Sequence, residues 1–317
     1  MVRRSLIRAL VVALGVASIL GLPALAQAAF PGENGAIVFQ SWRTCSAPTV
    51  GPCADATELY AQLPPRRVAA ALTANGSFDG EPSWSADGTQ LVFFSTRDGN
   101  AEIYVLDELG ERRLTNNASD DWDPSWSPDG DKIAFASDRD GNPEIYVMDA
   151  DGTDPIRLTH DGAFDEAPAF SPDGELIAWS RGNDIYTMTP AGVVVAALTS
   201  TPSLAESEPD WSPDGTRLVF TCQTPLPVNV CVMNSDGSGL ASLTASKGDE
   251  RNLDPVWSPD GTKIAFVSER RRAPAIWVMN ADGTHQQQVS KGFDRFPSWQ
   301  PLPAGGAAWN PAGSPKR

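Results

Sequence analysis

The feature that most constrains the fold is a repeat of about forty residues. One copy, "PSWSPDGDKIAFASDRDGNPEIYVMDADG" at residues 124–152, recurs with changes along most of the chain. An aromatic residue two positions after each repeated proline marks the period, with intervals of 42, 44, 41, 46 and 42 residues. A period in the low forties that contains several short strands is typical of a four-stranded propeller blade. The aromatic residues are Trp84, Trp126, Phe170, Trp211, Trp257 and Trp299.

Each repeat divides into four short runs, which we name A to D. In the copy that begins at residue 124 they are 124–127, 132–137, 144–149 and 156–159. The runs are rich in β-branched and aromatic residues, and turn residues such as Pro, Asp and Gly separate them. No segment of the repeats has the periodicity of a long helix. The pattern therefore predicts an all-β protein.

The repeats also predict how the ring of blades closes. A runs and B runs each occur six times, but the first B run, near Ala36, has no A run before it. The last A run, at Pro297, has no B run after it. We therefore expect a six-bladed β-propeller of four-stranded antiparallel blades, in which the C-terminal A strand pairs with the N-terminal strands. This closure leaves no open sheet edge between the first and last blades.

The two ends of the chain differ from the repeats. Residues 1–28 carry Arg3, Arg4 and Arg8, a short apolar stretch and a final Ala-Gln-Ala, which are the features of a secretory signal peptide. The apolar stretch is too short for a membrane span, so we expect an exported mature chain without a transmembrane segment, periplasmic or extracellular. Residues 29–300 are expected to form the propeller. Residues 301–317, rich in Pro, Gly and Ala, are expected to be a disordered tail.

The chain is strongly acidic, with a net charge of −16. Residues 1–28 hold three arginines and no acidic residue, so removing them leaves a charge of −16 − 3 = −19. This acidity argues against nucleic acid as a partner. It favours cations or the basic surface of a partner protein, and we expect a monomer.

Four cysteines form two close pairs in the sequence, Cys45 with Cys53 and Cys222 with Cys231. Each pair brackets the segment between a B run and a C run. In an exported chain this arrangement predicts two disulfides across hairpins. A zinc site is disfavoured by the spacing and by the presence of only two histidines in the chain.

The two faces of the predicted ring differ in sequence. Because strand direction alternates, the A–B and C–D turns lie on one face, and the B–C and D–A loops lie on the other. The A–B turns are uniform, with Ser-Pro-Asp-Gly or Ser-Ala-Asp-Gly in five copies. The B–C loops vary, most clearly at residues 43–57, 221–231 and 270–272. Divergent loops on a rigid scaffold often carry binding, so we expect the binding surface on the loop face, which carries the B–C and D–A loops.

Acidic residues recur just before the A runs, where each D–A link reaches the central channel. Crowded carboxylates repel one another unless they are hydrogen-bonded, ion-paired or bound to a cation. They predict a channel mouth that binds Ca²⁺ or a cationic segment of a partner. The alternative is architectural, with each side chain capping its own turn or bonding the backbone of the next blade. The candidates are Asp79, Asp121, Asp165, Glu206, Asn252 and Asp294, three positions before the proline, and Glu81, Asp123, Glu208 and Asp254, immediately before it.

The repeat, with its PSWSPDG, RDGN and EIYVMDADG segments, resembles that of the TolB propeller family over roughly residues 30–300. The resemblance implies a periplasmic or secreted, non-catalytic six-bladed propeller. For TolB itself it implies docking of a peptidoglycan-associated lipoprotein at the channel mouth. TolB carries a separate α/β domain before its propeller, whereas only the expected signal peptide precedes Ala36 here, so we expect a TolB-like propeller alone.

Two classes of function remain open. The first is a non-catalytic scaffold that binds a protein partner through the loop face and the acidic channel mouth. The second is a metal-dependent, Ca²⁺-type hydrolase, lactonase or lyase with its site in the central channel. The sequence assigns no catalytic residue, since it contains no G-x-S-x-G and its two histidines, His160 and His285, lie far apart. The only cofactor it suggests is Ca²⁺.

Overall fold

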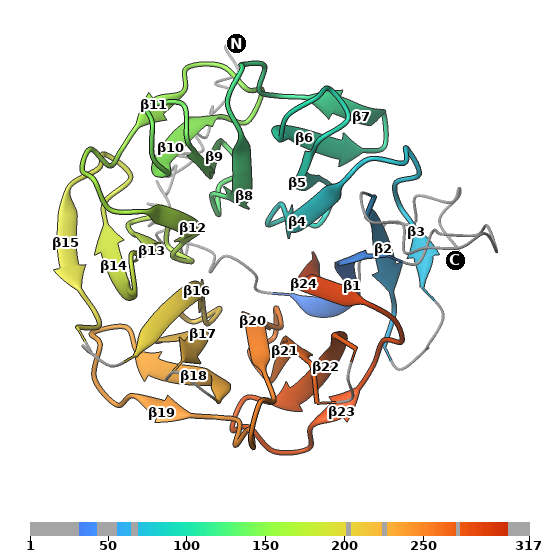
Figure 1. Ribbon diagram of the computed structural model, residues 1–317, viewed down its shortest axis with the longest axis vertical. Coiled ribbons are helices and arrows are strands. Elements are labelled where there is room, and N and C mark those ends of the chain that lie inside the picture. Colours follow the sequence, from blue (N-terminus) through green and yellow to red (C-terminus); the bar gives the residue numbers. More distant parts are fainter. Residues whose placement is uncertain are drawn as a thin grey trace, which may run out of the picture.

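The structure, a computed structural model, describes residues 32–42, 56–64, 69–200, 204–223, 227–270 and 273–303. Within those ranges the chain forms six antiparallel sheets of four strands each, arranged as blades around a central axis (Figure 1). All elements of the described ranges are strands. The fold is a six-bladed β-propeller, which confirms the fold predicted from the repeat. No helix long and apolar enough to cross a membrane occurs in the described residues.

Five blades follow the chain without interruption, each with its first strand innermost and its last at the rim (Figure 1). The first three contain β4 (Asp79–Trp84), β5 (Leu91–Ser95), β6 (Glu102–Asp107), β7 (Gly110–Arg113), β8 (Asp121–Trp126), β9 (Lys132–Ser137), β10 (Glu144–Asp149), β11 (Ile156–Arg157), β12 (Asp165–Phe170), β13 (Ile177–Arg181), β14 (Asp184–Met188) and β15 (Val194–Ala197). The next two contain β16 (Ala205–Trp211), β17 (Arg217–Gln223), β18 (Val228–Asn234), β19 (Ala241–Ser242), β20 (Asn252–Trp257), β21 (Lys263–Ser268), β22 (Ala275–Asn280) and β23 (Gln287–Gln288).

The sixth blade joins the two ends of the described chain. Its inner strand is the C-terminal β24 (Asp294–Leu302), followed outward by β1 (Glu33–Ser41), β2 (Glu58–Gln62) and β3 (Ala70–Ala71). β24 and β1 are antiparallel, which confirms the closure predicted from the unpaired A and B runs. Because Glu33 pairs with Leu302, both described ends leave the ring on the face that carries the A–B turns.

The A–B turns owe their uniformity to a local hydrogen-bond pattern. In one copy, Ser127 Oγ donates to Asp129 Oδ1 over 2.6 Å, and the backbone N–H of Lys132 donates to Ser127 Oγ over 2.9 Å. Gly130 adopts φ of 76°, a left-handed conformation that glycine enters without strain. The same side-chain bond recurs in the other four Ser-x-Asp-Gly turns, at Ser85, Ser171, Ser212 and Ser258. The geometry of these turns therefore explains why their sequence is uniform on this face of the ring.

The aromatic residues of the repeat pack between neighbouring blades. Trp126 of β8 is buried against Val92 and Ile103 of the preceding blade and Ile133 of its own. Such contacts bury large side chains at every blade junction and hold the ring together. Substitution of an equivalent tryptophan by alanine would cost about 3–5 kcal/mol of stability.

Candidate binding site at the channel mouth

Each inner strand contains a β-bulge immediately before its repeated proline. The pairing of β8 with β9 shifts in register between Trp122 and Ser125, and the other inner strands shift at the same place. The residue before the proline adopts a left-handed backbone conformation, which is uncommon for residues other than glycine. The six residues are Glu81, Asp123, Ala167, Glu208, Asp254 and Phe296, with φ between 49° and 57°.

The bulges surround a central cavity of about 170 Å³ on the propeller axis. All six bulge residues line it, together with the prolines that follow them and four of the repeat's aromatic residues, Trp126, Phe170, Trp257 and Trp299. Four of the six are acidic, and Asp210, two positions after Glu208, adds a fifth carboxyl group. Among the described lining residues there is no lysine or arginine. The described lining is therefore a cluster of carboxyl groups without a basic residue.

Hydrogen bonds from blade to blade connect the bulge residues. The backbone N–H of Asp123 donates to Glu81 Oε2 over 2.9 Å, and that of Ala167 donates to Asp123 Oδ2 over 2.9 Å. The N–H of Asp254 donates to Glu208 Oε2 over 3.2 Å, and Asp254 in turn accepts from the N–H of Phe296. Each carboxylate thus satisfies a backbone donor of the next blade, which is the architectural role that the sequence left open.

A hydroxyl replaces the carboxylate where the bulge residue has no acceptor. Ala167 cannot accept the N–H of Glu208, and Ser180 Oγ of β13 accepts it instead over 2.9 Å. In the next blade Thr221 Oγ1 accepts the N–H of Asp254 over 3.1 Å and donates to Glu208. The backbone donors at these two junctions are therefore satisfied with or without a preceding acid.

Burial and mutual repulsion favour the protonated form of these carboxyl groups. Burial raises the pKa of Asp123 to about 6, and burial followed by repulsion from Asp123 raises the pKa of Glu81 well above its ordinary value. The pKa of Asp254 is also well above its ordinary value, through burial and then repulsion from Glu208. Burial raises the pKa of Asp210 to about 7, although the N–H of Trp257 donates to its Oδ2 over 2.7 Å. Burial also raises the pKa of Glu166, beside Asp123 and Glu208.

The second predicted set, three positions before the proline, lies elsewhere. The inner strands begin three or four residues before the proline, whereas the repeat predicted a start at the proline itself. The residues of this set are fully or almost fully buried at the start of these strands, and none lines the described part of the cavity. They are Asp79, Asp121, Asp165, Glu206, Asn252 and Asp294.

Hydrogen bonds within and beside each blade hold this buried set. Asp121 accepts from Arg139 Nη2 at 2.7 Å and from Asn117 Nδ2 at 2.7 Å. The guanidinium of Arg139 also lies over the ring of Tyr146, 4.5 Å from its centroid, a cation–π geometry. Further hydrogen bonds of this set join Asp79 with Arg97 and Asn75, Asp165 with Trp179, Asn252 with Arg270 and Ser246, and Asp294 with Ser41.

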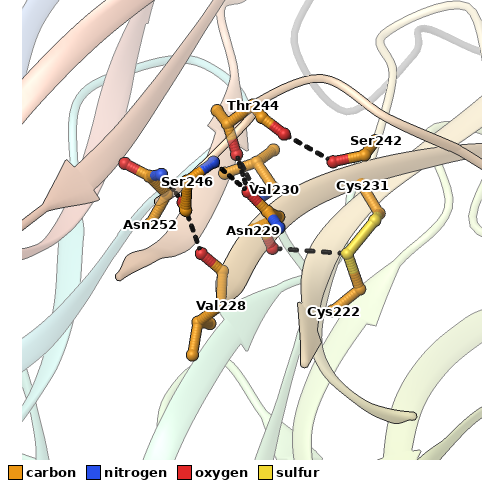
Figure 2. The surroundings of a disulfide bond; sticks show 9 residues. All are labelled: Cys222, Val228, Asn229, Val230, Cys231, Ser242, Thr244, Ser246 and Asn252. Carbon is orange, nitrogen blue, oxygen red and sulfur yellow. Dashed lines mark hydrogen bonds between the residues drawn. A yellow bond between two sulfur atoms is a disulfide. The ribbon is translucent and has the colours of Figure 1, made fainter. Parts of the chain in front are cut away.

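Figure 2 shows the surroundings of the disulfide between Cys222 and Cys231, which joins β17 to β18. Asn229, in the same hairpin, accepts the N–H of Ser246 over 2.9 Å, and Ser246 Oγ donates to the carbonyl of Val228. The disulfide-closed hairpin therefore fixes a D–A link of the loop face. It confirms one of the two predicted disulfides, and the other, Cys45–Cys53, lies outside the described residues.

Two acidic residues near the cavity were missed by the reasoning from sequence. Glu166 lies two positions before its proline, between the two places that the repeat marked, and Asp210 lies one position after its proline. At the position of Asp210 the other blades carry Ser83, Ser125, Ala169, Val256 and Ser298. An acid among small or apolar residues at one position was the signal that could have revealed it.

Metal binding has limited support in the described residues. No three His, Cys, Asp or Glu side chains in the ranges given above are arranged to hold a metal ion. The carboxyl groups of the cavity supply oxygen ligands, but their hydrogen bonds point them toward neighbouring backbones.

The fold is a six-bladed β-propeller with an acidic axial cavity. The profile of the TolB beta propeller domain matches residues 66–207 and 197–305. The chain belongs to this family. A comparison with the sequences of curated proteins returned no match.

Solved structures with the same fold include two TolB chains. TolB from Acinetobacter baumannii is 22% identical, with a TM-score of 0.71, over 84% of this chain and 67% of that chain. A chain assigned as TolB from Agrobacterium tumefaciens is 22% identical, with a TM-score of 0.62, over 89% of this chain and 96% of that chain. An oligogalacturonate lyase from Vibrio parahaemolyticus is 14% identical, with a TM-score of 0.52, over 74% of this chain and 71% of that chain. At these identities the likeness shows the fold alone.

Proposed function

We propose that the protein is an exported, monomeric, non-catalytic propeller scaffold. It binds a protein partner through the loop face and takes a cationic side chain of that partner into the acidic channel mouth. The observation that carries the proposal is the axial cavity, where Glu81, Asp123, Glu208 and Asp254 meet without a basic residue among the described lining. A cation there would offset the burial and mutual repulsion that raise the pKa values of Glu81, Asp123 and Asp254.

Export is part of the same proposal. The signal-like residues 1–28 motivate it, and the Cys222–Cys231 disulfide suggests an oxidising compartment. Family membership supports a scaffold, since the chain has the propeller of TolB.

The test is calorimetric titration with a capped decapeptide of alternating glycine and lysine. We expect saturable binding that weakens about tenfold or more in the Glu81→Gln/Asp254→Asn variant, because both variant side chains keep an oxygen acceptor but lose the charge. Asp151→Asn is the matched control, since Asp151 is exposed in a hairpin of the opposite face. Equal affinity in all three proteins would overturn the proposal.

A second candidate is a metal-dependent hydrolase, lactonase or lyase in the channel. The carboxyl oxygens of the cavity favour it, since Ca²⁺ prefers such ligands. Titration with Ca²⁺ distinguishes the two candidates. Micromolar Ca²⁺ binding that is lost in the Glu81→Gln/Asp254→Asn variant, together with Ca²⁺-dependent lactone hydrolysis, would support the enzyme over the scaffold.

A further inference from the structure

Two exposed phenylalanines stand at equivalent places on the loop face. Phe164 immediately precedes Asp165, the first residue of β12, and Phe293 immediately precedes Asp294, the first residue of β24. Their exposed fractions are 62% and 56%, although the aspartates beside them are fully buried. Large apolar side chains exposed beside a cavity are typical of interaction surfaces.

The corresponding phenylalanine of another blade shows how this position is covered when it serves packing. Phe78, before β4, stacks on Phe94 with ring centroids 5.6 Å apart and meets the edge of Trp42 at 6.1 Å. Phe78 is half-buried, whereas Phe164 and Phe293 are largely open to solvent. The two exposed rings are therefore not required by the fold at this position.

The two phenylalanines lie on opposite sides of the channel mouth. β12 packs between β8 and β16, while β24 packs between β20 and β4, so two blades stand between the two strands in either direction. Figure 1 shows β12 and β24 facing each other across the axis. A line drawn from β12 to β24 passes across the ring of inner strands that lines the acidic cavity (Figure 1).

The same two blades are those whose bulge residue is apolar. Ala167 follows Phe164 on β12, and Phe296 follows Phe293 on β24, and both line the cavity. The acidic pair of β4 and β8 lies on one side of this line, and the acidic pair of β16 and β20 lies on the other. The pairs are Glu81 with Asp123 and Glu208 with Asp254.

Two charged residues flank the line, an acidic one on β12 and a basic one on β24. The basic one, Arg295, also acts on Asp254, where its charge partly offsets the rise in the pKa of the carboxyl group that burial causes. Glu166, between Phe164 and Ala167, adds a half-buried carboxyl group close to Asp123 and Glu208. Arg295, at the matching position of β24, is ion-paired with Glu269. The mouth therefore offers an acidic centre with an exposed aromatic ring at each end of one diameter.

We infer that the partner presents a segment with a basic residue between two apolar residues, lying across the mouth from Phe164 to Phe293. The apolar residues pack on the two rings, and the lysine or arginine between them enters the acidic cavity. The described chain ends, Glu33 of β1 and Leu302 of β24, lie at the opposite face. The inference rests on the proposed function and specifies the chemistry of the partner.

The test selects binders from a random peptide library displayed on phage, with the purified protein as bait. We expect selected sequences to share a basic residue flanked on both sides by apolar residues. A synthetic peptide of the consensus sequence is then titrated against variants. Affinity should fall about tenfold in Phe164→Ser/Phe293→Ser and be retained in Phe164→Leu/Phe293→Leu. Leu109→Ser is the control, since Leu109 is 92% exposed in a hairpin of the opposite face.

The outcomes separate the inference from the proposed function. Equal thermal stability of the variants shows that the changes act on binding alone. One outcome is a consensus peptide that depends on the carboxyl groups and yet binds Phe164→Ser/Phe293→Ser as tightly as it binds the unmodified protein. This result would overturn the inference and leave the proposed function standing. Binding that is unchanged in Glu81→Gln/Asp254→Asn, or a library that yields no consensus, would overturn both.

Discussion

The backbone N–H of Asp123 donates a hydrogen bond to Oε2 of Glu81 across the junction between two blades, over 2.9 Å. Glu81 therefore accepts a backbone hydrogen bond through one carboxyl oxygen while it lines the cavity. The same relationship joins Asp123 to Ala167 and Glu208 to Asp254. The same side chains therefore form the hydrogen bonds between blades and determine the electrostatics of the cavity. Substitutions that keep the acceptor oxygen but remove the ionisable group can separate the two roles.

Glutamine and alanine at position 81 should have opposite effects on stability. Glu81→Gln keeps an oxygen that accepts the N–H of Asp123, so the free energy of unfolding should be unchanged or higher at pH 7.5. Glu81→Ala leaves that N–H without its acceptor and should lower the free energy of unfolding by about 1–3 kcal/mol. Alanine itself fits the backbone there, because Ala167 adopts the same left-handed conformation. Urea unfolding measures both variants, and equal stability would contradict the structural role of the bond.

Stability should fall as the pH rises from about 4 to about 7. The pKa of Asp210 is raised to about 7 and that of Asp123 to about 6, from an ordinary value of 3.8. Groups with a raised pKa bind protons more tightly in the folded chain than in the unfolded chain. Their favourable contribution to the free energy of unfolding is therefore complete below pH 4 and is lost as the pH rises through the raised pKa values. Asp210→Asn removes one such group and keeps an acceptor for the N–H of Trp257.

The Asp210→Asn variant should therefore be more stable than the unmodified protein at pH 8, by roughly 1–2 kcal/mol after allowance for partial exposure. At pH 4 the two proteins should be nearly equal. Thermal unfolding across this pH range provides the measurement. A variant that loses stability equally at both pH values would show that Asp210 acts through packing or hydrogen bonding instead.

Substitutions at Gly80 and Gln40, which lie in neighbouring blades, should have strongly coupled effects on the free energy of unfolding. A Cβ atom on Gly80 would lie 2.3 Å from Gln40 Oε1 and 2.8 Å from Phe94, so Gly80→Ala should lower the free energy of unfolding by about 1–3 kcal/mol. Gln40→Ala should recover part of that loss by removing the nearer contact. A double-mutant cycle in urea measures the coupling, and strictly additive effects would contradict it.

The sequence repeat predicted the number of blades, the closure by β24 and β1, and the Cys222–Cys231 disulfide, because each depends on period or spacing alone. It did not separate the two acidic sets. In a regular strand, Asp121 and Asp123 would point to the same side, since side chains alternate with a period of two. The bulge at Asp123 breaks this alternation, so Asp121 is buried while Asp123 lines the cavity. A bulge depends on pairing with β9, which a single strand's sequence does not reveal.

The Cys222–Cys231 disulfide should stabilise the protein by closing a short loop in the unfolded chain. Its cysteines are nine positions apart, and the loop-entropy relation gives about 2–3 kcal/mol for such a loop. Cys222→Ala/Cys231→Ala should lower the free energy of unfolding by this amount under non-reducing conditions. An unchanged urea midpoint with an unchanged slope would exclude a stabilising disulfide at this position.

Proton release on binding tests the proposed role of the channel mouth most directly. If a lysine enters the cavity, it stabilises the ionised carboxyl groups, and Glu81, Asp123 and Asp254 must give up protons. Calorimetric titration of the glycine–lysine decapeptide at pH 6.5, in buffers of different ionisation enthalpy, measures the number released. We expect a net release of about one proton per bound peptide, which disappears in Glu81→Gln/Asp254→Asn. Saturable binding without proton release, or release that is unchanged in this variant, would contradict a cation site among these carboxyl groups.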